Sequence, residues 1–270
     1  MGVLQAATTP WSYSGATGPD HWGDLNADWA IAKTGRRQSP VNIVTTDLVA
    51  DDPSLVECRF VPTRFSIVDT GQTIQLVPQR PGNRVSIGDR GGELLQAHFH
   101  APGEHLLDGR RFPLELHLVF GDADVQTPLA AVAPEPAMKA KRDHASDLLS
   151  ASVAAVADVH AVLGVFIVAG RTNEWLREVL AGVPADVTAA PRLTAPIDLG
   201  GLVSRPSPVF SYAGSLTTPP CTQGVTWLLL ASPVEFSAEQ IGAFTRLYDQ
   251  TARPVQPLNG RKIRLHTSLT

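Results

Sequence analysis

The sequence has no long hydrophobic run and no block of basic residues. Its longest apolar stretch, residues 161–169, is far shorter than the roughly 20 residues that a membrane-spanning helix needs. Twenty-two basic and 26 acidic residues give a net charge of −4, which disfavours nucleic acid or an anionic membrane as a partner. These absences leave a globular protein of 270 residues, long enough to bury a large core.

Cysteine is also scarce, because Cys58 and Cys221 are the only two in the chain. A disulfide between them would indicate an oxidising compartment, and two buried thiols would not; the sequence leaves both alternatives open. No basic segment followed by an apolar stretch is visible at the N-terminus, so no signal peptide is predicted. We expect either a cytoplasmic protein or an exported one whose leader has been removed.

Glycine and proline are abundant instead, at 22 each, and they interrupt the chain throughout. Long helical windows are therefore rare, which favours many short strands joined by turns and long connections. No linker and no internal repeat divides the chain, so we expect a single domain over residues 1–270. The predicted fold class is mainly β, an α+β domain with a few short peripheral helices.

Hydrophobic periodicity and turn residues predict the main elements. Residues 1–40 are expected to form an irregular wrap over the core, and Ser237 is expected to cap the last helix. The predicted strands are residues 114–120, 162–168 and 225–230, and the predicted helices are residues 139–159, 173–180 and 238–247.

Three histidines, His98, His100 and His117, carry the main chemical signal. His98 and His100 are two residues apart on a predicted strand, so they point to the same face. The intervening Asp108-Gly109 pair is typical of a two-residue hairpin turn, and pairing centred on it would set His100 directly opposite His117. The three imidazoles are then predicted to converge on one side of one sheet.

Three neutral imidazoles with an open fourth position are typical of a catalytic zinc site. Water at that position has its pKa lowered to about 7, which supplies a hydroxide nucleophile at neutral pH. A single strand histidine is more often a buried, hydrogen-bonded residue than a ligand. Three that converge favour Zn²⁺ as the cofactor.

Six short blocks spread along nearly the whole chain add a second signal. They are Trp11-Ser12-Tyr13 with Gly18-Pro19 and Trp22; residues 38–43; residues 96–100 with Glu104-His105; residues 115–119; residues 214–220 with 225–227; and residues 253–258. In this order they resemble the alpha-class carbonic anhydrases of bacterial type. The resemblance implies a large, mostly antiparallel twisted central sheet with zinc at the bottom of a cone, and the reversible hydration of carbon dioxide to bicarbonate and a proton.

The resemblance also implies roles for side chains around the metal. Thr217 would accept a hydrogen bond from the zinc-bound hydroxide and donate its own to Glu104, which together are the expected catalytic pair. Glu115 would orient the third histidine through its other ring nitrogen, and Gln96 would hold the first in the same way. Without the histidines, Thr217 would be interpreted as a turn residue and Glu115 as a hydrated strand charge.

A small, linear, apolar substrate is bound best by an apolar pocket wall from which water is excluded. Val119, Val162, Leu216 and Trp227 match the hydrophobic pocket of the family, although by composition each is equally a core residue. Thr218 would line the polar side of the cavity. Sulfonamides and other anions are the inhibitors that the resemblance implies, because an anionic nitrogen would replace hydroxide on the metal.

The chain departs from the family in its proton shuttle. Fast members carry a histidine at the position of Gln72, which here follows Asp69-Thr70-Gly71. Glutamine does not titrate near neutral pH, whereas histidine does. We therefore expect slow turnover that relies on buffer or on another group.

Further departures lie elsewhere in the chain. An atypical insertion at about residues 121–158 is well above normal loop length; we interpret it as a surface elaboration, with an oligomer contact or a lid as the alternative, which leaves a homodimer open. Ala32-Lys33-Thr34 stands where exported relatives carry the cysteine that pairs with the one at Cys221. Thr251-Ala252 stands where an asparagine is common, so the hydrogen bonding beneath the cavity is expected to differ.

The sequence admits three functions. The first is a zinc lyase that hydrates carbon dioxide. The second is a non-catalytic carbonic-anhydrase-related binding module, and the presence of all three histidines argues against it. The third is a weak zinc esterase as a side activity. By family analogy the compartment is periplasmic or extracellular, and otherwise cytoplasmic.

Overall fold

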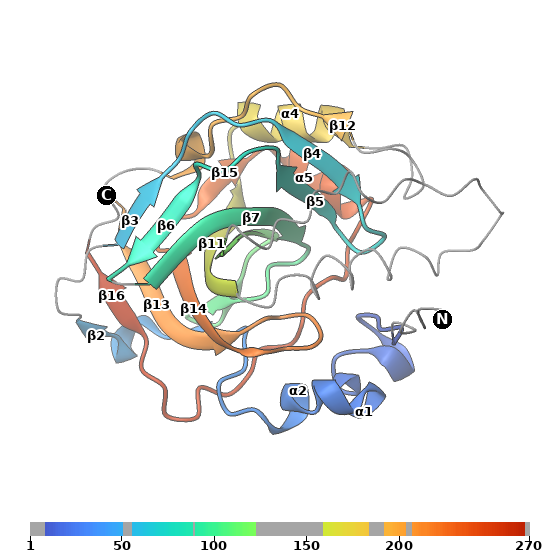
Figure 1. Cartoon of the computed structure of the whole chain (residues 1–270), viewed down its shortest axis with the longest axis vertical. Coiled ribbons are helices and arrows are strands. Elements are labelled where there is room, and N and C mark those ends of the chain that lie inside the picture. Colours follow the sequence, from blue (N-terminus) through green and yellow to red (C-terminus); the bar gives the residue numbers. More distant parts are fainter. Residues whose placement is uncertain are drawn as a thin grey trace, which may run out of the picture.

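The computed structural model describes residues 9–50, 56–88, 90–122, 159–183, 192–203 and 207–267 (Figure 1). Almost the whole insertion at 121–158 lies outside these ranges. The predicted helix at 139–159 also lies outside them, apart from Val159, which begins a strand.

A large twisted sheet forms the centre of the described part (Figure 1). Its strands run in the order β12-β4-β5-β7-β10-β11-β14-β13-β16-β2, with β6 and β15 pairing at β7 and β11, and β3 at β6. The bounds are β2 Val49–Ala50, β3 Val56–Arg59, β4 Phe65–Asp69, β5 Ile74–Pro78, β6 Arg84–Ile87, β7 Arg90–His100, β10 Leu114–Gly121, β11 Val159–Ala169, β12 Arg192–Leu193, β13 Val209–Ser215, β14 Gln223–Leu230, β15 Val234–Phe236 and β16 Arg264–His266. A small second sheet contains β1 Asn42–Ile43, β8 Leu106–Leu107 and β9 Arg110–Arg111.

The main sheet is mixed, which refines the expectation of a mostly antiparallel one. Strand β10 pairs antiparallel with both β7 and β11. Strand β11, however, pairs in parallel with β14 and with β15, and β16 pairs in parallel with β2. The predicted fold class, mainly β with a few short helices, is confirmed.

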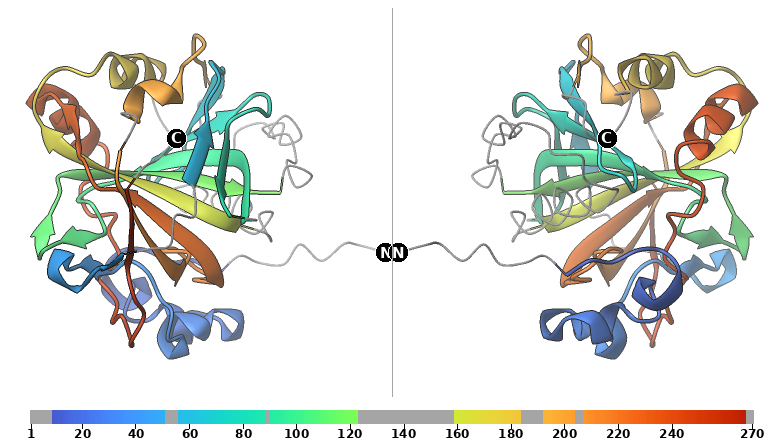
Figure 2. Two further views of the ribbon diagram at one scale, coloured as in Figure 1. Left: turned by 90° about the vertical axis from the view of Figure 1, so that its left-hand side faces the viewer. Right: turned by 90° about the vertical axis from the view of Figure 1, so that its right-hand side faces the viewer.

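The helices are short and lie on both sides of the sheet (Figure 2). Asn173 caps α4 by accepting a hydrogen bond from the backbone of Leu176, and Ser237 caps α5 in a capping box with Gln240. No helix within the described ranges is both long enough and apolar enough to span a bilayer. The helical segments are η1 Gly15–Thr17, α1 Trp22–Leu25, η2 Ala27–Trp29, α2 Ile31–Thr34, η3 Thr45–Asp47, α4 Glu174–Gly182, η7 Leu199–Leu202 and α5 Ala238–Thr245.

Strand alternation divides the central side chains between two faces. On β10, Leu116 and Leu118 join the larger hydrophobic cluster, whereas Val119 joins a second cluster that contains Trp227. Because successive strand residues point to opposite faces, His117 lies on the Val119 face. The sheet therefore has the larger apolar core on one face, and a second apolar cluster together with buried His117 on the other.

The register between β7 and β10 differs from the prediction. The Asp108-Gly109 turn has positive φ at both residues and pairs Leu107 with Arg110, as a two-residue hairpin requires. On one side of the turn, five residues (101–105) lie between His100, the last residue of β7, and the start of β8. On the other side, only three residues (112–114) lie between Arg111 and Glu115, which pairs with His100. The extra two residues shift the register by two.

As a result His117 lies opposite His98, and the expected pairing of His117 with His100 is wrong. A shift of two residues preserves the alternation of a strand, whereas a shift of one would have reversed it. All three histidines therefore remain on one face despite the error.

The backbone of Gly92 packs closely against that of Gly121. A Cβ atom added at this position in β7 would lie 2.5 Å from the carbonyl oxygen and 2.7 Å from the nitrogen of Gly121. Gly92→Ala should therefore lower the free energy of unfolding by about 1–3 kcal/mol, as overpacking usually does. Chemical denaturation measures this, with Gly201→Ala as the control because a Cβ there meets nothing within 4 Å. Equal stabilities of the two variants would contradict the predicted contact.

Candidate metal centre

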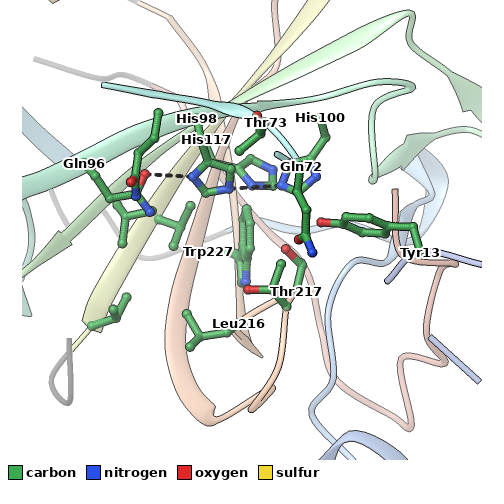
Figure 3. A pocket seen from close by; sticks show the side chains of 15 residues that line it. Tyr13, Gln72, Thr73, Gln96, His98, His100, His117, Leu216, Thr217 and Trp227 are labelled. Carbon is green, nitrogen blue, oxygen red and sulfur yellow. Dashed lines mark hydrogen bonds between the residues drawn. The ribbon is translucent and has the colours of Figure 1, made fainter. Parts of the chain in front are cut away.

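The three predicted histidines come together in the lining of one pocket (Figure 3). Strand β7 contributes His98 and His100, and β10 contributes His117. One ring nitrogen from each lies within 4.8 Å of the corresponding nitrogens of the other two. The set can therefore surround a single ion.

The second ring nitrogen of each histidine is held by an oxygen acceptor. The pairs are His98 Nδ1 with Gln96 Oε1 at 2.8 Å, His100 Nδ1 with the Thr251 carbonyl at 2.5 Å, and His117 Nε2 with Glu115 Oε1 at 2.8 Å. A carbonyl or carboxylate oxygen only accepts, so each of these ring nitrogens carries the hydrogen. In a neutral imidazole the other nitrogen then has a bare lone pair.

Burial keeps these rings neutral. Desolvation lowers the pKa of all three histidines and lowers that of His100 to about 4, against opposing effects of the Thr251 carbonyl and Glu115. The unprotonated nitrogens therefore face one another, and Nε2 of His98 lies 3.0 Å from Nε2 of His100. Two lone pairs at this separation repel, and a cation between them removes the conflict. Three neutral imidazole donors are a set that zinc prefers, so the residues present fit that ion.

Glu115 is fully buried and uses both carboxylate oxygens. Oε1 lies 2.8 Å from His117 Nε2 and 2.7 Å from His105 Nδ1, and Oε2 accepts the backbone N–H groups of Glu104 and His105, each at 2.8 Å. Burial by itself would raise the pKa of Glu115, but the two histidine rings hold it well below its usual value. The other nitrogen of His105 lies 2.6 Å from the hydroxyl of Tyr212. This network fixes the His117 ring from behind.

Glu104 has a carboxylate oxygen without a partner. Oε1 accepts the backbone N–H of Arg253 at 2.8 Å. Oε2 is buried, has no hydrogen-bond partner among the described residues, and lies 3.5 Å from His100 Nε2 and 4.0 Å from His117 Nδ1. Burial raises the pKa of Glu104 to about 7, while His117, the Arg253 N–H and the Thr217 hydroxyl oppose the shift. Thr217 is therefore near this carboxyl, although it makes no regular hydrogen bond to Oε2.

The lining of the pocket is both apolar and polar (Figure 3). All the side chains expected to form the substrate pocket line it, and so do Gln72, Gln96 and Thr217. The apolar wall consists of Val119, Val159, Val162, Leu216 and Trp227. The polar residues of the lining are Tyr13, Gln72, Thr73, Gln75, Gln96, Thr217 and Thr218.

Four lining residues were not anticipated as pocket residues: Tyr13, Thr73, Gln75 and Val159. Gln75 lies opposite His98 because β5 pairs with β7, a pairing that no short turn signals. Strand alternation could have placed Gln75 on the metal face only if that pairing had been known. Tyr13 enters from the N-terminal wrap, far from the other residues in the sequence.

Gln72 lies on the turn between β4 and β5. The turn is held by Asp69, whose Oδ1 accepts the backbone N–H of Gly71 at 2.9 Å, and by Thr70, whose hydroxyl donates to the carbonyl of Thr73. The Gln72 Nε2 donates to the carbonyl of Trp11 over 3.4 Å, and its Oε1 is buried without a partner among the described residues. The amide is thus part of the pocket lining.

The two cysteines lie in separate parts of the core. Cys58 belongs to the larger hydrophobic cluster, whereas Cys221 packs with Trp11, Trp22 and Ala32. No disulfide joins the two residues, so of the two alternatives left open by the sequence the structure has two buried thiols.

Comparisons with known proteins agree with this site. A sequence profile of the eukaryotic-type carbonic anhydrases matches residues 17–267. A carbonic anhydrase from Nostoc sp. is 33% identical over 263 residues, which cover 96% of this chain and 87% of that protein. One from Pectobacterium carotovorum is 34% identical over 254 residues, which cover 94% and 89%.

Solved structures extend the agreement to the fold. The alpha-carbonic anhydrase from Thermovibrio ammonificans, in complex with the inhibitor sulfanilamide, superposes with a TM-score of 0.79 at 33% identity, covering 96% of this chain and all of that one. The profile match spans most of the chain and includes every histidine of the centre. The chain therefore belongs to the eukaryotic-type, or alpha-class, carbonic anhydrase family, whose enzymes hydrate carbon dioxide reversibly.

Proposed function

We propose that this carbonic anhydrase is zinc-dependent and that His98, His100 and His117 hold the ion. One observation carries the proposal: three neutral rings, of which His100 and His117 are buried and His98 is partly buried, turn their lone pairs toward one point, while an oxygen acceptor holds each opposite nitrogen. When bound, zinc supplies a Lewis acid that lowers the pKa of a water molecule to about 7.

Glu104 and Thr217 would orient the attacking nucleophile. The unpartnered Oε2 of Glu104 can accept the Thr217 O–H once that side chain turns toward it. The Thr217 oxygen is then left as an acceptor for the hydrogen of the nucleophile, and a nucleophile lone pair faces the substrate carbon. Such preorganised hydrogen bonds are usually the largest electrostatic contribution to catalysis.

The apolar wall would hold carbon dioxide beside the histidines. The Trp227 indole is fixed in place because its N–H donates to the carbonyl of Ser215 at 2.8 Å. The wall contains no hydrogen-bonding group that the linear substrate would have to satisfy. Thr218, which also lines the pocket, can hydrogen-bond to the polar product. A primary sulfonamide is expected to occupy the same pocket, supported by the sulfanilamide complex of the Thermovibrio relative.

Proton removal is expected to depend on buffer because Gln72 does not titrate near neutral pH. Turnover should rise with buffer concentration, and Gln72→His should raise kcat in weak buffer by about tenfold or more. Stopped-flow hydration assays over a buffer series measure both effects. Gln72→Asn is the matched control, since it keeps an amide on the same turn and should bring no gain. A kcat that changes neither with buffer concentration nor with the Gln72→His substitution would exclude this account of the proton step.

Removal of the metal tests the proposed function as a whole. Wild-type protein should contain one zinc per chain, and dialysis against a chelator should abolish both zinc content and carbon dioxide hydration. Adding zinc should restore both, whereas magnesium should restore neither because neutral imidazoles favour zinc over that ion. Hydration by protein free of metal would overturn the proposal, and zinc binding without hydration would favour the binding-module alternative.

A further inference from the structure

A segment without regular secondary structure, residues 251–253, passes beneath the metal centre. The carbonyl of Thr251 holds His100 Nδ1 at 2.5 Å. The same residue is tied to the end of β7, because its N–H donates to the carbonyl of Ala101 at 2.8 Å and its hydroxyl accepts the Ala101 N–H at 3.0 Å. The orientation of the His100 ring therefore depends on where this segment lies.

The same segment also holds Glu104. The backbone N–H of Arg253 donates to Glu104 Oε1 at 2.8 Å, which leaves Oε2 directed toward the ring nitrogens of His100 and His117. Three consecutive residues thus provide the backbone partners of one proposed zinc ligand and of the buried carboxylate beside it. A displacement of the segment would misplace both groups together.

The Arg253 side chain connects this segment to the N-terminal wrap. The side chain is buried and does not belong to the pocket lining. Its contacts are Nη1 with Gln38 Oε1 and with the carbonyl of Ser39, both at 2.8 Å, Nη2 with the carbonyl of Ala32 at 3.0 Å, and the ring of Trp22, whose centroid lies 5.6 Å from Cζ.

These contacts require a side chain that can donate several hydrogen bonds at once inside the protein. Burial of a guanidinium costs least when its hydrogens find acceptors. Here Nη1 and Nη2 donate to neutral oxygens and the ring of Trp22 lies beside the group, whereas Nε has no partner among the described residues. The planar fork of arginine reaches several acceptors at once, which a lysine ammonium on a single stem does not. A displacement of the N-terminal wrap would therefore also displace the backbone of the 251–253 segment.

We propose that Arg253 is a positioning residue of the metal centre: its guanidinium anchors the 251–253 segment to the N-terminal wrap and so sets the His100 ring and the Glu104 carboxylate. This inference rests on the proposed function, since it concerns how well the same histidines hold zinc. It predicts that a residue with no atom in the pocket controls zinc affinity.

The test is the zinc dissociation constant of folded protein, measured by competition with a chelator. Arg253→Gln should weaken zinc binding by about tenfold, the lower end of the effect of losing an outer partner of a metal ligand, because the backbone partners themselves remain. Arg253→Lys should weaken it less. Circular dichroism first selects a temperature at which every variant is folded. Stopped-flow assays of the zinc-loaded variants should then show a fall in kcat with little change in KM, because the substrate wall is untouched.

Arg64→Gln is the matched control. Arg64 also donates from its guanidinium to a backbone carbonyl, that of Thr194 at 3.2 Å, and neither residue belongs to the pocket lining or to the donor set. Its loss should cost stability but leave the zinc dissociation constant within about twofold. The proposal is overturned if Arg253→Gln behaves like this control, with reduced stability and unchanged zinc affinity.

A second variant decides the question if Arg253→Gln does not fold. Gln38→Met removes one acceptor of the guanidinium and no atom of the 251–253 segment, so it should weaken zinc binding in the same direction by a smaller factor. Wild-type affinity in that folded variant would overturn the proposal. Zinc binding by the wild type tests the proposed function separately, because only the ratio of variant to wild-type affinity tests the role of Arg253.

Discussion

Replacing His117 with alanine should abolish zinc binding at the concentrations of a hydration assay and reduce activity to the level of the metal-free protein. Structural zinc sites in zinc-finger peptides are worth about 10–16 kcal/mol, so one ligand of four contributes about 2.5–4 kcal/mol. At 1.4 kcal/mol for each factor of ten, its loss weakens affinity by about 60- to 700-fold. The variant also leaves Glu115 without one of its two histidine partners.

Zinc content after dialysis and stopped-flow hydration measure the His117→Ala effect. His160→Ala is the control, because this imidazole lies on β11, is partly exposed and pairs with Asp122 at 3.0 Å, outside the metal centre. It should bind zinc like the wild type. An alanine variant at position 117 that retained one tightly bound zinc per chain would show that the ion is held elsewhere.

Replacing Thr217 with alanine should have a different outcome, in which zinc stays bound and kcat falls by about 100-fold or more. Thr217 does not belong to the donor set around the ion, so affinity should change little. The loss removes one preorganised hydrogen-bonding group at the reacting atoms, which typically costs 100- to 1,000-fold in kcat. The nucleophile would then rotate freely relative to the substrate.

Thr217→Ser provides the rescue control, since it restores the hydroxyl and should recover most of the activity. Zinc content measured in parallel shows whether a fall in kcat comes from loss of zinc or from loss of the Thr217 hydroxyl. Wild-type kcat in the alanine variant would remove Thr217 from the reaction, and loss of zinc in that variant would give Thr217 a structural role instead.

Local signals in the sequence were sufficient for several elements. Residues 114–120 and 162–168 form strands β10 and β11, and Ser237 caps α5 as expected. Hydrophobic alternation and capping involve residues close together in the chain, so neither needs knowledge of the partners. The Asp108-Gly109 turn also formed as predicted because its geometry follows from its own two residues.

Strand register and strand pairing between distant segments could not be predicted from local patterns. The β7–β10 register depends on unequal connections on the two sides of the turn, and the sequence contains no measure of how they fold. The parallel pairing of β11 with β14 joins strands more than 50 residues apart. Gln75 reaches the pocket only because β5 pairs with β7. Each depends on tertiary contacts that local periodicity does not encode.

The sequence by itself determined the donor set and its common face. Residues two apart on a strand share a side, and this alternation survives a register shift of two, so His98, His100 and His117 converge whichever of the first two lies opposite the third.

Only the tertiary structure decided which nitrogen of each ring is left bare. That choice depends on the acceptor behind the ring, and for His100 the acceptor is the backbone carbonyl of Thr251, 151 residues away. Every residue type provides such a carbonyl, so no side-chain pattern could reveal it. The same holds for the backbone N–H of Arg253 that orients Glu104.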